Sequence, residues 1–310
     1  MPKVTICVPV YNCERSIDAC LASALQQSYS DFECLVIDNA STDSTFDHVM
    51  AFNDPRIRAL RNTENIGPVA NQNRCIRYAS GDLIQFLHGD DRLLPDCLSR
   101  LVPTFTDPRV GMAFARRRIE SSDPKWAILI GTLHTPLEPL EHVNDGMNII
   151  RRYVDKGSRG NWFGEPTSVM IRRSVLTEVG GFNPEMPAWN DMELWLRILA
   201  RSDAAWVDLE LTVRNQHPEN LTALYESTDE AWLDRVRILS ELARNRDLER
   251  RIRIKARRQW IVAVLKKGVR AQLAPSDVRR TKYKQLGRHV RQSLSSNPSS
   301  NTVSLVCDSP

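Results

Sequence analysis

The residues of this chain that could do chemistry centre on two adjacent carboxylates, Asp90 and Asp91, with His88 just before them. The apolar run 83–87 precedes this group, so we expect a buried strand that ends at an acidic loop. In open parallel sheets, ligands bind at the carboxyl ends of the strands. Carboxylates and an imidazole there could hold a hard divalent cation, which often carries substrate phosphates. Turn and helix-cap roles for the two aspartates are the alternative interpretation.

Polar groups also follow the two earlier strands that the sequence predicts. Tyr11 and Asn12 come directly after the β-branched run 4–10, and Asp38 follows the run 32–37. Because neighbouring parallel strands end at one rim, we expect these groups to converge there. An aromatic ring, a carboxylate that accepts hydrogen bonds from a base, and a metal-holding carboxylate would suit a nucleoside diphosphate. Ordinary loop composition is the alternative interpretation.

The elements that must position these residues alternate between strand and helix in the first third of the chain. The strands expected there are 4–10, 32–37, 57–60 and 83–87, and the helices between them are 17–27, a short one after 44, and 68–79. This order predicts an α/β fold with a parallel sheet and helices on both faces. Further strands are expected at 110–115, 126–130, 168–171 and 206–213, and further helices at 147–154 and 191–200. Pro95 suits the first position of a helix after the acidic loop.

Several classes of protein are disfavoured by what the chain of 310 residues lacks. It has no Gly-x-Gly-x-x-Gly after the first strand and no P-loop, which argues against a Rossmann dehydrogenase and a P-loop kinase. The seven cysteines are odd in number and form no Cys-x-x-Cys pair, so we expect reduced thiols in a cytosolic protein and no zinc site. We expect no signal peptide and no membrane-spanning helix, since no apolar run approaches about 20 residues.

Positive charge is concentrated near the end of the chain. Residues 244–291 hold 17 Lys and Arg against 3 Asp and Glu, while the whole chain has a net charge of only +4. We therefore expect a basic helical extension over residues 229–291 and a disordered tail over 292–310. The extension could lie on an anionic membrane surface. A solvated helix or an oligomer contact is the alternative, and no recognition motif supports nucleic-acid binding.

Eight short motifs occur in order along the chain, at residues 8–12, 36–43, 65–67, 81–82, 86–91, 180–182, 190–197 and 214–218. In this order and spacing they resemble the family 2 glycosyltransferases, and the resemblance covers roughly residues 3–220. It implies the GT-A fold, a Rossmann-like α/β architecture with a mostly parallel central sheet, helices on both faces and, here, a C-terminal helical extension. The implied domain spans 1–222, with a nucleotide-sugar-binding half at 1–115 and an acceptor and catalytic half at 116–222.

The resemblance assigns roles to residues at the predicted rim. It implies donor contacts from Pro9, Tyr11, Asn12, Asp38, Asn65, His88, Gly89, Asp90, Asp91 and Arg214. Tyr11 would flank the base and Asp38 would accept a hydrogen bond from it. Asp90 would bind Mn²⁺ or Mg²⁺, with His217 as a further metal or diphosphate ligand. His88 stands where the family has its first carboxylate, and imidazole suits Mn²⁺ better than Mg²⁺.

On the acceptor side, the resemblance implies that Asp191 is the catalytic base. A helix N-cap is the alternative role for this carboxylate. Asn190 replaces the acidic residue that precedes the base in the family. Trp162, Glu165, Trp189 and Asn190 are the candidates for acceptor contacts, with core packing as the alternative for both tryptophans. Arg214 could pair with the diphosphate as a fork donor.

The implied activity is that of an inverting, metal-dependent, hexosyltransferase-like enzyme. It would move a sugar from a nucleotide-diphosphate sugar, UDP-linked, to the hydroxyl of a glycan or lipid-linked acceptor in polysaccharide, glycolipid or cell-surface glycan synthesis. The expected location is cytoplasmic, with peripheral contact at the inner face of the membrane. His88 and Asn190 motivate the main alternative, a catalytically silent nucleotide-sugar-binding or scaffold protein. A nucleotidyltransferase usually carries a Gly-rich loop where Tyr11 and Asn12 stand.

Overall fold

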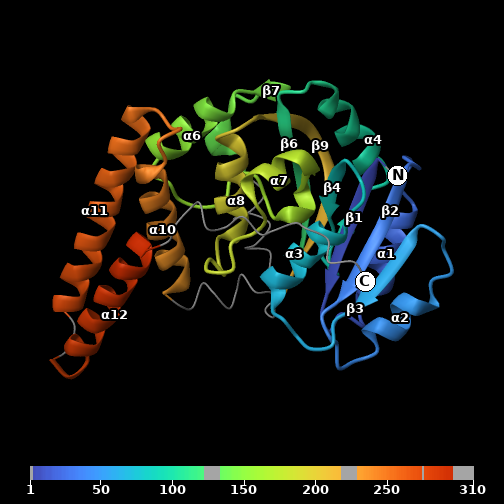
Figure 1. The fold of residues 1–310 in the computed structure, drawn as a ribbon, viewed down its shortest axis with the longest axis horizontal. Coiled ribbons are helices and arrows are strands. Elements are labelled where there is room, and N and C mark those ends of the chain that lie inside the picture. Colours follow the sequence, from blue (N-terminus) through green and yellow to red (C-terminus); the bar gives the residue numbers. More distant parts are fainter. Residues whose placement is uncertain (1–2, 122–132, 218–228, 274–275, 296–310) are drawn as a thin grey trace.

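A single mixed sheet forms the centre of the protein (Figure 1). The structure is a computed structural model that describes residues 3–121, 133–217, 229–273 and 276–295, and within them nine strands join this sheet. The strands are β1 (Val4–Val10), β2 (Phe32–Asp38), β3 (Ile57–Arg61), β4 (Leu83–Phe86), β5 (Arg92–Leu93), β6 (Val110–Ser121), β7 (Val143–Asn144), β8 (Val169–Arg172) and β9 (Asp203–Gln216). Their order is β3-β2-β1-β4-β8-β6-β9-β5, and β7 pairs with β9.

Strand direction divides the sheet into two parts. In the first part, β1 pairs in parallel with β2 and β4, and β2 pairs in parallel with β3, as the sequence predicts. In the second part, β8 is antiparallel to both β4 and β6, while β6 and β9 are parallel to each other. The ends of β1, β2 and β4 therefore meet at one rim, where the polar groups were expected.

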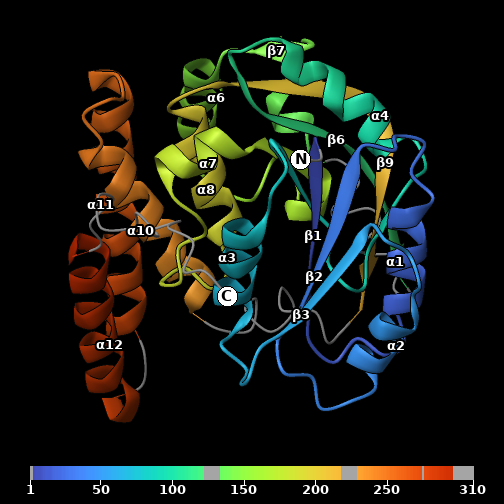
Figure 2. The same cartoon turned by 45° about the vertical axis from the view of Figure 1, so that its right-hand side comes forward.

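Helices cover both faces of the sheet, which confirms the predicted fold class (Figure 2). They are α1 (Ile17–Leu25), α2 (Thr45–Ala51), α3 (Pro68–Tyr78), α4 (Cys97–Leu101), α6 (Gly146–Asp155), α7 (Arg173–Val179), α8 (Asn190–Leu199), α10 (Glu230–Arg244), α11 (Arg250–Gln272) and α12 (Ser276–Ser295). Short 3-10 turns lie at Val102–Thr106, Thr135–Leu137 and Pro166–Ser168. Alternate residues of β1 face opposite sides: Ile6 and Val8 pack with α1, α2 and α4, whereas Cys7 packs with α3, α6 and α8.

The stretch after the acidic loop differs from the expectation. Pro95 does not begin a helix, because α4 starts at Cys97. The chain first forms the two-residue strand β5, which pairs antiparallel with β9 so that Arg92 lies opposite Val213. Because β5 follows the acidic loop directly, this pairing carries the loop to the end of β9. The strand expected at 126–130 lies outside the described residues.

The basic extension is helical, as predicted, and it forms a three-helix unit at one end of the molecule, opposite α1 and α2 (Figures 1 and 2). Its first helix is attached firmly, since Ile238, Leu239 and Leu242 of α10 belong to the same core cluster as α8. Helix α12 runs to Ser295, so the predicted tail begins later than residue 292, and 296–310 lie outside the described residues. None of the helices described is both long and apolar enough to cross a membrane.

Candidate active site

The loops after β1 and β2 are tied into one edge. The hydroxyl of Ser41 accepts a hydrogen bond from the backbone N–H of Asn12 at 2.9 Å, and Oδ1 of Asn12 accepts one from the backbone N–H of Thr42 at 2.9 Å. Asn12 has φ 51°, a left-handed conformation that asparagine tolerates better than most residues. Pro9 lies just before, within β1. This edge presents the ring of Tyr11, which is 43% exposed, at the surface.

Two of the residues expected to contact the donor have protein partners in this structure, and one of them, Asp38, was expected to accept a hydrogen bond from the base. Asp38 is fully buried, with Oδ2 at 3.0 Å from Nε of Arg61, and it also accepts hydrogen bonds from the backbone N–H and the hydroxyl of Ser41. Oδ1 of Asn65 accepts a hydrogen bond from the Asn39 amide at 2.8 Å. The carboxylate of Asp38 therefore holds the loop in place, and a base could reach it only by replacing one of these partners.

The acidic loop and the end of β9 meet through Asp90 and His217. Oδ2 of Asp90 lies 3.1 Å from Nε2 of His217, and both side chains are partly exposed. The pairing of β5 with β9 explains this approach, because it fixes the acidic loop beside the last residues of β9. The sequence assigned both residues to one metal or diphosphate site, and the structure brings them together.

The other two members of the loop have partners within the protein. Asp91 accepts hydrogen bonds from the hydroxyl of Thr167 at 2.7 Å and from the backbone N–H of Asn215 at 3.1 Å. Burial raises the pKa of Asp91 well above its usual range. Nε2 of His88 lies 3.1 Å from the amide nitrogen of Gln72, and burial lowers the pKa of His88, so its imidazole is neutral. Only Asp90 of the three therefore offers an exposed anionic oxygen.

Gly89 allows the acidic loop to approach the loop after β1. A Cβ at this position would lie 2.9 Å from Sγ of Cys13, closer than side chains pack. The glycine at this point of the motif is thus explained by the close approach of two loops. No donor contact of Gly89 is needed to account for it.

A buried ion-pair network is centred on Glu165. Oε2 of Glu165 lies 3.1 Å from Nε of Arg117 and 3.1 Å from Nη1 of Arg214. Burial alone would raise the pKa of Glu165, but the two arginines lower it to about 2. Glu165 is therefore an internal counter-ion that orients Arg214, which corrects the expectation that it faces an acceptor.

Asp191 is the second residue of α8, because Trp189 is the N-cap and Asn190 is the first helical residue. Its Oδ2 accepts a hydrogen bond from the Asn161 amide at 2.7 Å, and its Oδ1 accepts one from the backbone N–H of Met192 at 2.6 Å. Burial raises the pKa of Asp191 to about 6, and the charges of Glu165 and Arg214 also act on it. A carboxylate with this pKa is ionised at neutral pH and is still basic enough to take a proton.

Helix α10 supports the segment that carries Asp191. Oδ2 of the fully buried Asp234 accepts hydrogen bonds from the backbone N–H groups of Ala188 at 2.8 Å and Trp189 at 3.1 Å. Burial raises the pKa of Asp234 to about 6. No motif of the sequence points to this residue. The signal that could have found it is a carboxylate among the apolar positions of α10, beside Leu233 and Ile238.

Two of the short motifs, at residues 180–182 and 190–197, form one structural unit. Arg197 donates hydrogen bonds to the carbonyl oxygens of Gly180 at 3.2 Å and Gly181 at 2.6 Å, and it pairs with Glu193. A Cβ at Gly181 would lie 2.3 Å from Oδ1 of Asn73, so only glycine fits there. Glu193 and Arg197 therefore fix α8 against the glycine turn, and this spacing serves to position Asp191.

The two tryptophans proposed for the acceptor side are placed differently. The ring of Trp162 is 6% exposed and packs edge-on against Tyr153 at 4.9 Å, so core packing, the alternative interpretation, is correct for this residue. Trp189 is partly buried against the core at the start of α8, with Asn190 as the first helical residue. Trp189 and Asn190 directly precede Asp191 at the start of α8.

The side chains of this rim offer few ligands for a metal ion. Across the described residues, no group of three or more His, Cys, Asp or Glu side chains is placed to hold a metal ion. Asp90 and His217 could supply two ligands, since their separation of 3.1 Å matches adjacent ligands at about 2.1 Å from a six-coordinate ion. Such a pair fits an ion whose remaining ligands come from a diphosphate and water.

Comparisons with known proteins show the family of the chain. A sequence model of glycosyl transferase family 2 matches residues 5–180. An uncharacterized protein of Mycobacterium tuberculosis is 40% identical over 286 residues, which cover 92% of this chain and 89% of the relative. The Escherichia coli UDP-Glc:alpha-D-GlcNAc-diphosphoundecaprenol beta-1,3-glucosyltransferase WfaP is 30% identical over 203 residues, covering 65% of this chain and 72% of the relative.

Solved structures show the same fold at low identity. S. aureus TarS 1–349 in complex with UDP-GlcNAc aligns with a TM-score of 0.64 at 17% identity, covering 94% of this chain and 92% of TarS 1–349. The mannosyltransferase PcManGT from Pyrobaculum calidifontis, in complex with GDP-Man and Mn²⁺, aligns with a TM-score of 0.56 at 19% identity, covering 98% and 84%. Because the family model spans more than half of the chain and the sheet has the GT-A arrangement, the chain belongs to glycosyl transferase family 2.

Proposed function

We propose that the protein transfers a sugar from a UDP-linked donor to the hydroxyl of a glycan or lipid-linked acceptor, with inversion at the anomeric carbon. The observation that carries this proposal is Asp191, a carboxylate with a pKa of about 6 that is held by Asn161 and by the backbone of α8. A group of this kind is suited to general-base catalysis near neutral pH. Membership of a transferase family supports an acceptor hydroxyl as the group that this carboxylate deprotonates.

In the proposed reaction, Asp191 removes the proton of the acceptor hydroxyl while the oxygen attacks the anomeric carbon. The bond from that carbon to the diphosphate breaks as the new bond forms, and the diphosphate leaves with the electron pair. Arg214, oriented by Glu165, is a fork donor for the oxygens of the leaving group. Attack from the face opposite the leaving group inverts the configuration.

Asp90 and His217 are the residues that would hold Mn²⁺ or Mg²⁺ at the diphosphate. Such an ion, when bound, neutralises the charge that grows on the departing phosphate oxygens. His88 is the departure from the family pattern, but it is neutral and turned toward Gln72. It therefore leaves Asp90 as the carboxylate ligand and does not compete with it for the ion.

The donor and acceptor classes are proposed from the relatives. The E. coli relative WfaP is named for a UDP-Glc donor and a diphosphoundecaprenol-linked acceptor, and TarS was solved with UDP-GlcNAc. Tyr11 is the exposed ring at the end of β1 that would flank the base. Trp189 and Asn190, next to Asp191, are the positions proposed for acceptor contacts.

The test is turnover of a panel of nucleotide sugars with and without Mn²⁺, comparing wild type with Asp191→Asn. Asp31→Asn is the matched control, because Asp31 is an exposed carboxylate before β2. We expect transfer or donor hydrolysis by wild type and the control, and loss of it in Asp191→Asn. Binding of a donor without turnover in any of the three would instead favour a silent nucleotide-sugar-binding protein.

A further inference from the structure

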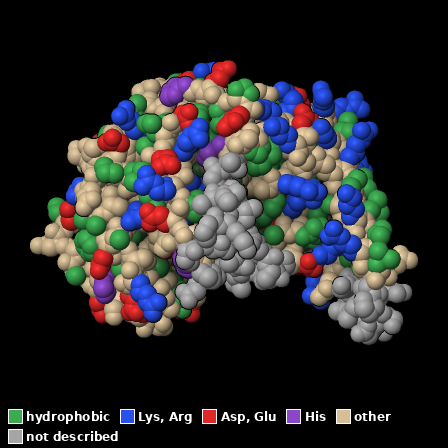
Figure 3. Space-filling model, turned by 180° about the vertical axis from the view of Figure 1, so that it is seen from behind, with side chains coloured by type: hydrophobic (Ala, Val, Ile, Leu, Met, Phe, Trp, Pro, Cys, Tyr) green, Lys and Arg blue, Asp and Glu red, His purple; other side chains and the backbone are tan. Residues whose placement is uncertain are grey.

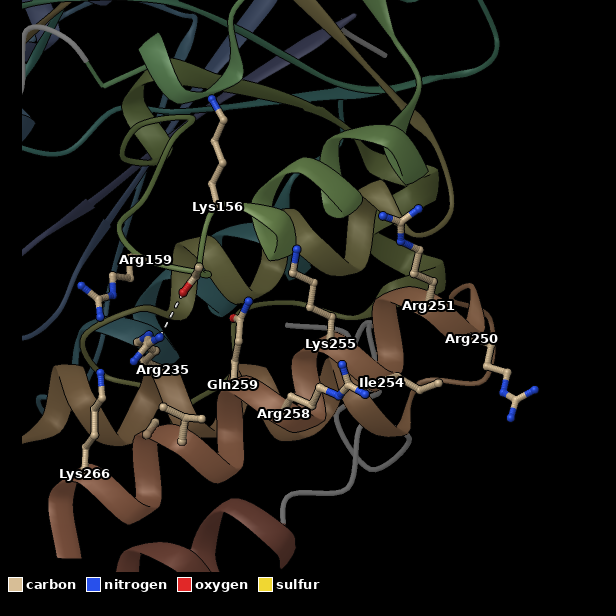
Figure 4. Close-up of a pocket in the computed structure, with 13 residues that line it drawn as sticks. Lys156, Arg159, Arg235, Arg250, Arg251, Ile254, Lys255, Arg258, Gln259 and Lys266 are labelled. Atoms are coloured by element: carbon tan, nitrogen blue, oxygen red, sulfur yellow. Dashed lines mark hydrogen bonds between the residues drawn. The ribbon is translucent and has the colours of Figure 1, made fainter. Parts of the chain in front are cut away.

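A positively charged groove lies along the helical extension (Figure 4). Its volume is about 1150 Å³, and it is bounded by the loop after α6, by α10 and by α11. Six of its cations are Lys156, Arg159, Arg235, Lys255, Arg258 and Lys266. Among the described residues, no Asp or Glu lines it. The positive charge of the groove is therefore not balanced by carboxylates among its described lining residues.

Protein groups satisfy only part of this charge. Three cations of the groove donate hydrogen bonds to oxygen atoms of the protein, either backbone carbonyls or a carboxylate: Lys156, Arg235 and Lys255. In contrast, the side chains of Arg159, Arg258 and Lys266 make no hydrogen bond or ion pair with any residue that the structure describes. Burial lowers the pKa of Arg235, and the neighbouring charge of Arg159 lowers it further. An anion in the groove would relieve this repulsion.

An apolar stripe continues from the groove along α11. Ile254 and Val262 line the groove itself and are 43% and 47% exposed. Leu265, Val269 and Leu273 follow at a spacing of four residues, so they lie on one side of the helix, and each is more than half exposed. Figure 3 shows Lys and Arg side chains next to hydrophobic side chains over this end of the molecule. Basic residues beside an exposed apolar stripe are typical of a helix that lies in a membrane interface.

We propose that the groove binds the phosphate headgroups of anionic phospholipids and that the apolar stripe of α11 enters the same bilayer surface. The positive charge of the groove would attract the anionic headgroups. The exposed leucines and valine of the stripe would be buried where the headgroups meet the acyl chains. A soluble anion would use only the groove, and a nucleic acid would leave the stripe in water. The proposal deepens the proposed function, since it places the enzyme where lipid-linked acceptors are, but vesicle binding does not depend on sugar transfer.

The test is co-sedimentation of the full chain with vesicles of phosphatidylcholine alone or with about 30% phosphatidylglycerol. The groove variant is Arg159→Glu, Arg258→Glu and Lys266→Glu. The matched control is Arg246→Glu, Arg257→Glu and Arg270→Glu, which changes the charge equally at exposed positions outside the groove. We expect wild type to bind only the anionic vesicles, the groove variant to lose at least about tenfold in affinity, and the control to lose much less.

A second arm tests the stripe without changing charge. Leu265→Gln with Val269→Gln alters two exposed side chains, so folding should be kept, and we expect weaker vesicle binding at unchanged thermal stability. Equal binding of wild type to neutral and anionic vesicles would overturn the proposal. So would an equal loss in the groove variant and its control, because binding would then follow overall charge. Turnover with a soluble acceptor, measured on the same samples, reports separately on the proposed function.

Discussion

Asp90 and His217 lie 3.1 Å apart although 127 positions separate them in the chain. The contact depends on β5, whose two residues pair with β9 directly after the acidic loop. A carboxylate from the first half of the fold and an imidazole from the second half are therefore held in one place. If these residues receive the metal and the diphosphate, donor binding also locks the two halves of the sheet together.

The first prediction concerns the metal. His217→Gln should weaken Mn²⁺ binding in the presence of UDP by roughly tenfold or more, because one of two protein ligands is lost. Titration calorimetry measures the affinity directly. His142→Gln is the control, since His142 is exposed in the loop before β7 and away from Asp90. Equal affinity of wild type and His217→Gln would remove His217 from the metal site.

A second prediction tests the departure from the family motif. In wild type, Nδ1 of His88 lies 3.8 Å from Oδ2 of Asp91. His88→Asp places a new carboxylate at this position, where burial disfavours a charged side chain. The pKa of the new aspartate should be raised, so its protonated form is favoured in the folded state and the cost grows as the pH rises. We expect a loss of about 1–3 kcal/mol in the free energy of unfolding at pH 8 and a smaller loss at pH 5.

Urea denaturation at both pH values measures this loss, and His142→Asp controls for the charge change at an exposed site. A loss that is the same at pH 5 and pH 8 would argue for a packing defect. Gain of Mg²⁺-supported turnover in His88→Asp would show that the family's first carboxylate has a metal role that His88 does not fill.

Residue types and spacing predicted the strand ends well and the long-range partners poorly. The places of Asp90 and Asp191 in the fold could be predicted because each sits in a motif next to a recognisable strand or helix. β5 could not be predicted, since two residues carry no periodicity and the strand exists only through its pairing with β9. The burial of Trp162 and the ion pairs of Glu165 likewise depend on residues far away in the chain.

The third prediction is a pH profile. Asp191 has a pKa of about 6, so kcat/KM should fall about tenfold per pH unit below that value and stay level above it. Asp191→Asn should lower kcat by roughly 10²–10⁴-fold. Initial rates between pH 5 and pH 9 measure both effects. A profile that stays flat through pH 6 would mean that another group takes the proton.

The same carboxylate gives a stability prediction. A raised pKa means that Asp191 favours the folded state only while it is protonated, and that this contribution is lost as the pH rises through about 6. Replacement by asparagine removes the cost of burying the charge. We therefore expect Asp191→Asn to be as stable as wild type or more stable at pH 8, and thermal melting at pH 5 and pH 8 tests this. A clear loss of stability at pH 8 would assign Asp191 to the fold instead.

The last prediction concerns Asp234, which holds the backbone N–H groups of Ala188 and Trp189 from the helical extension. Asp234→Ala leaves both donors and Arg237 without this acceptor, which should cost about 3 kcal/mol or more. Trp189 is the N-cap of α8, directly before the first turn that carries Asp191. We therefore expect the pH profile of the remaining activity to shift as well. Asp234→Asn keeps an acceptor oxygen, so it should restore much of the stability and much of the wild-type pH profile. Glu249→Ala, which breaks an exposed ion pair with Arg151, should change stability by less than about 1 kcal/mol. If Asp234→Ala lowers stability but leaves the pH profile unchanged, the extension supports the fold without positioning the base.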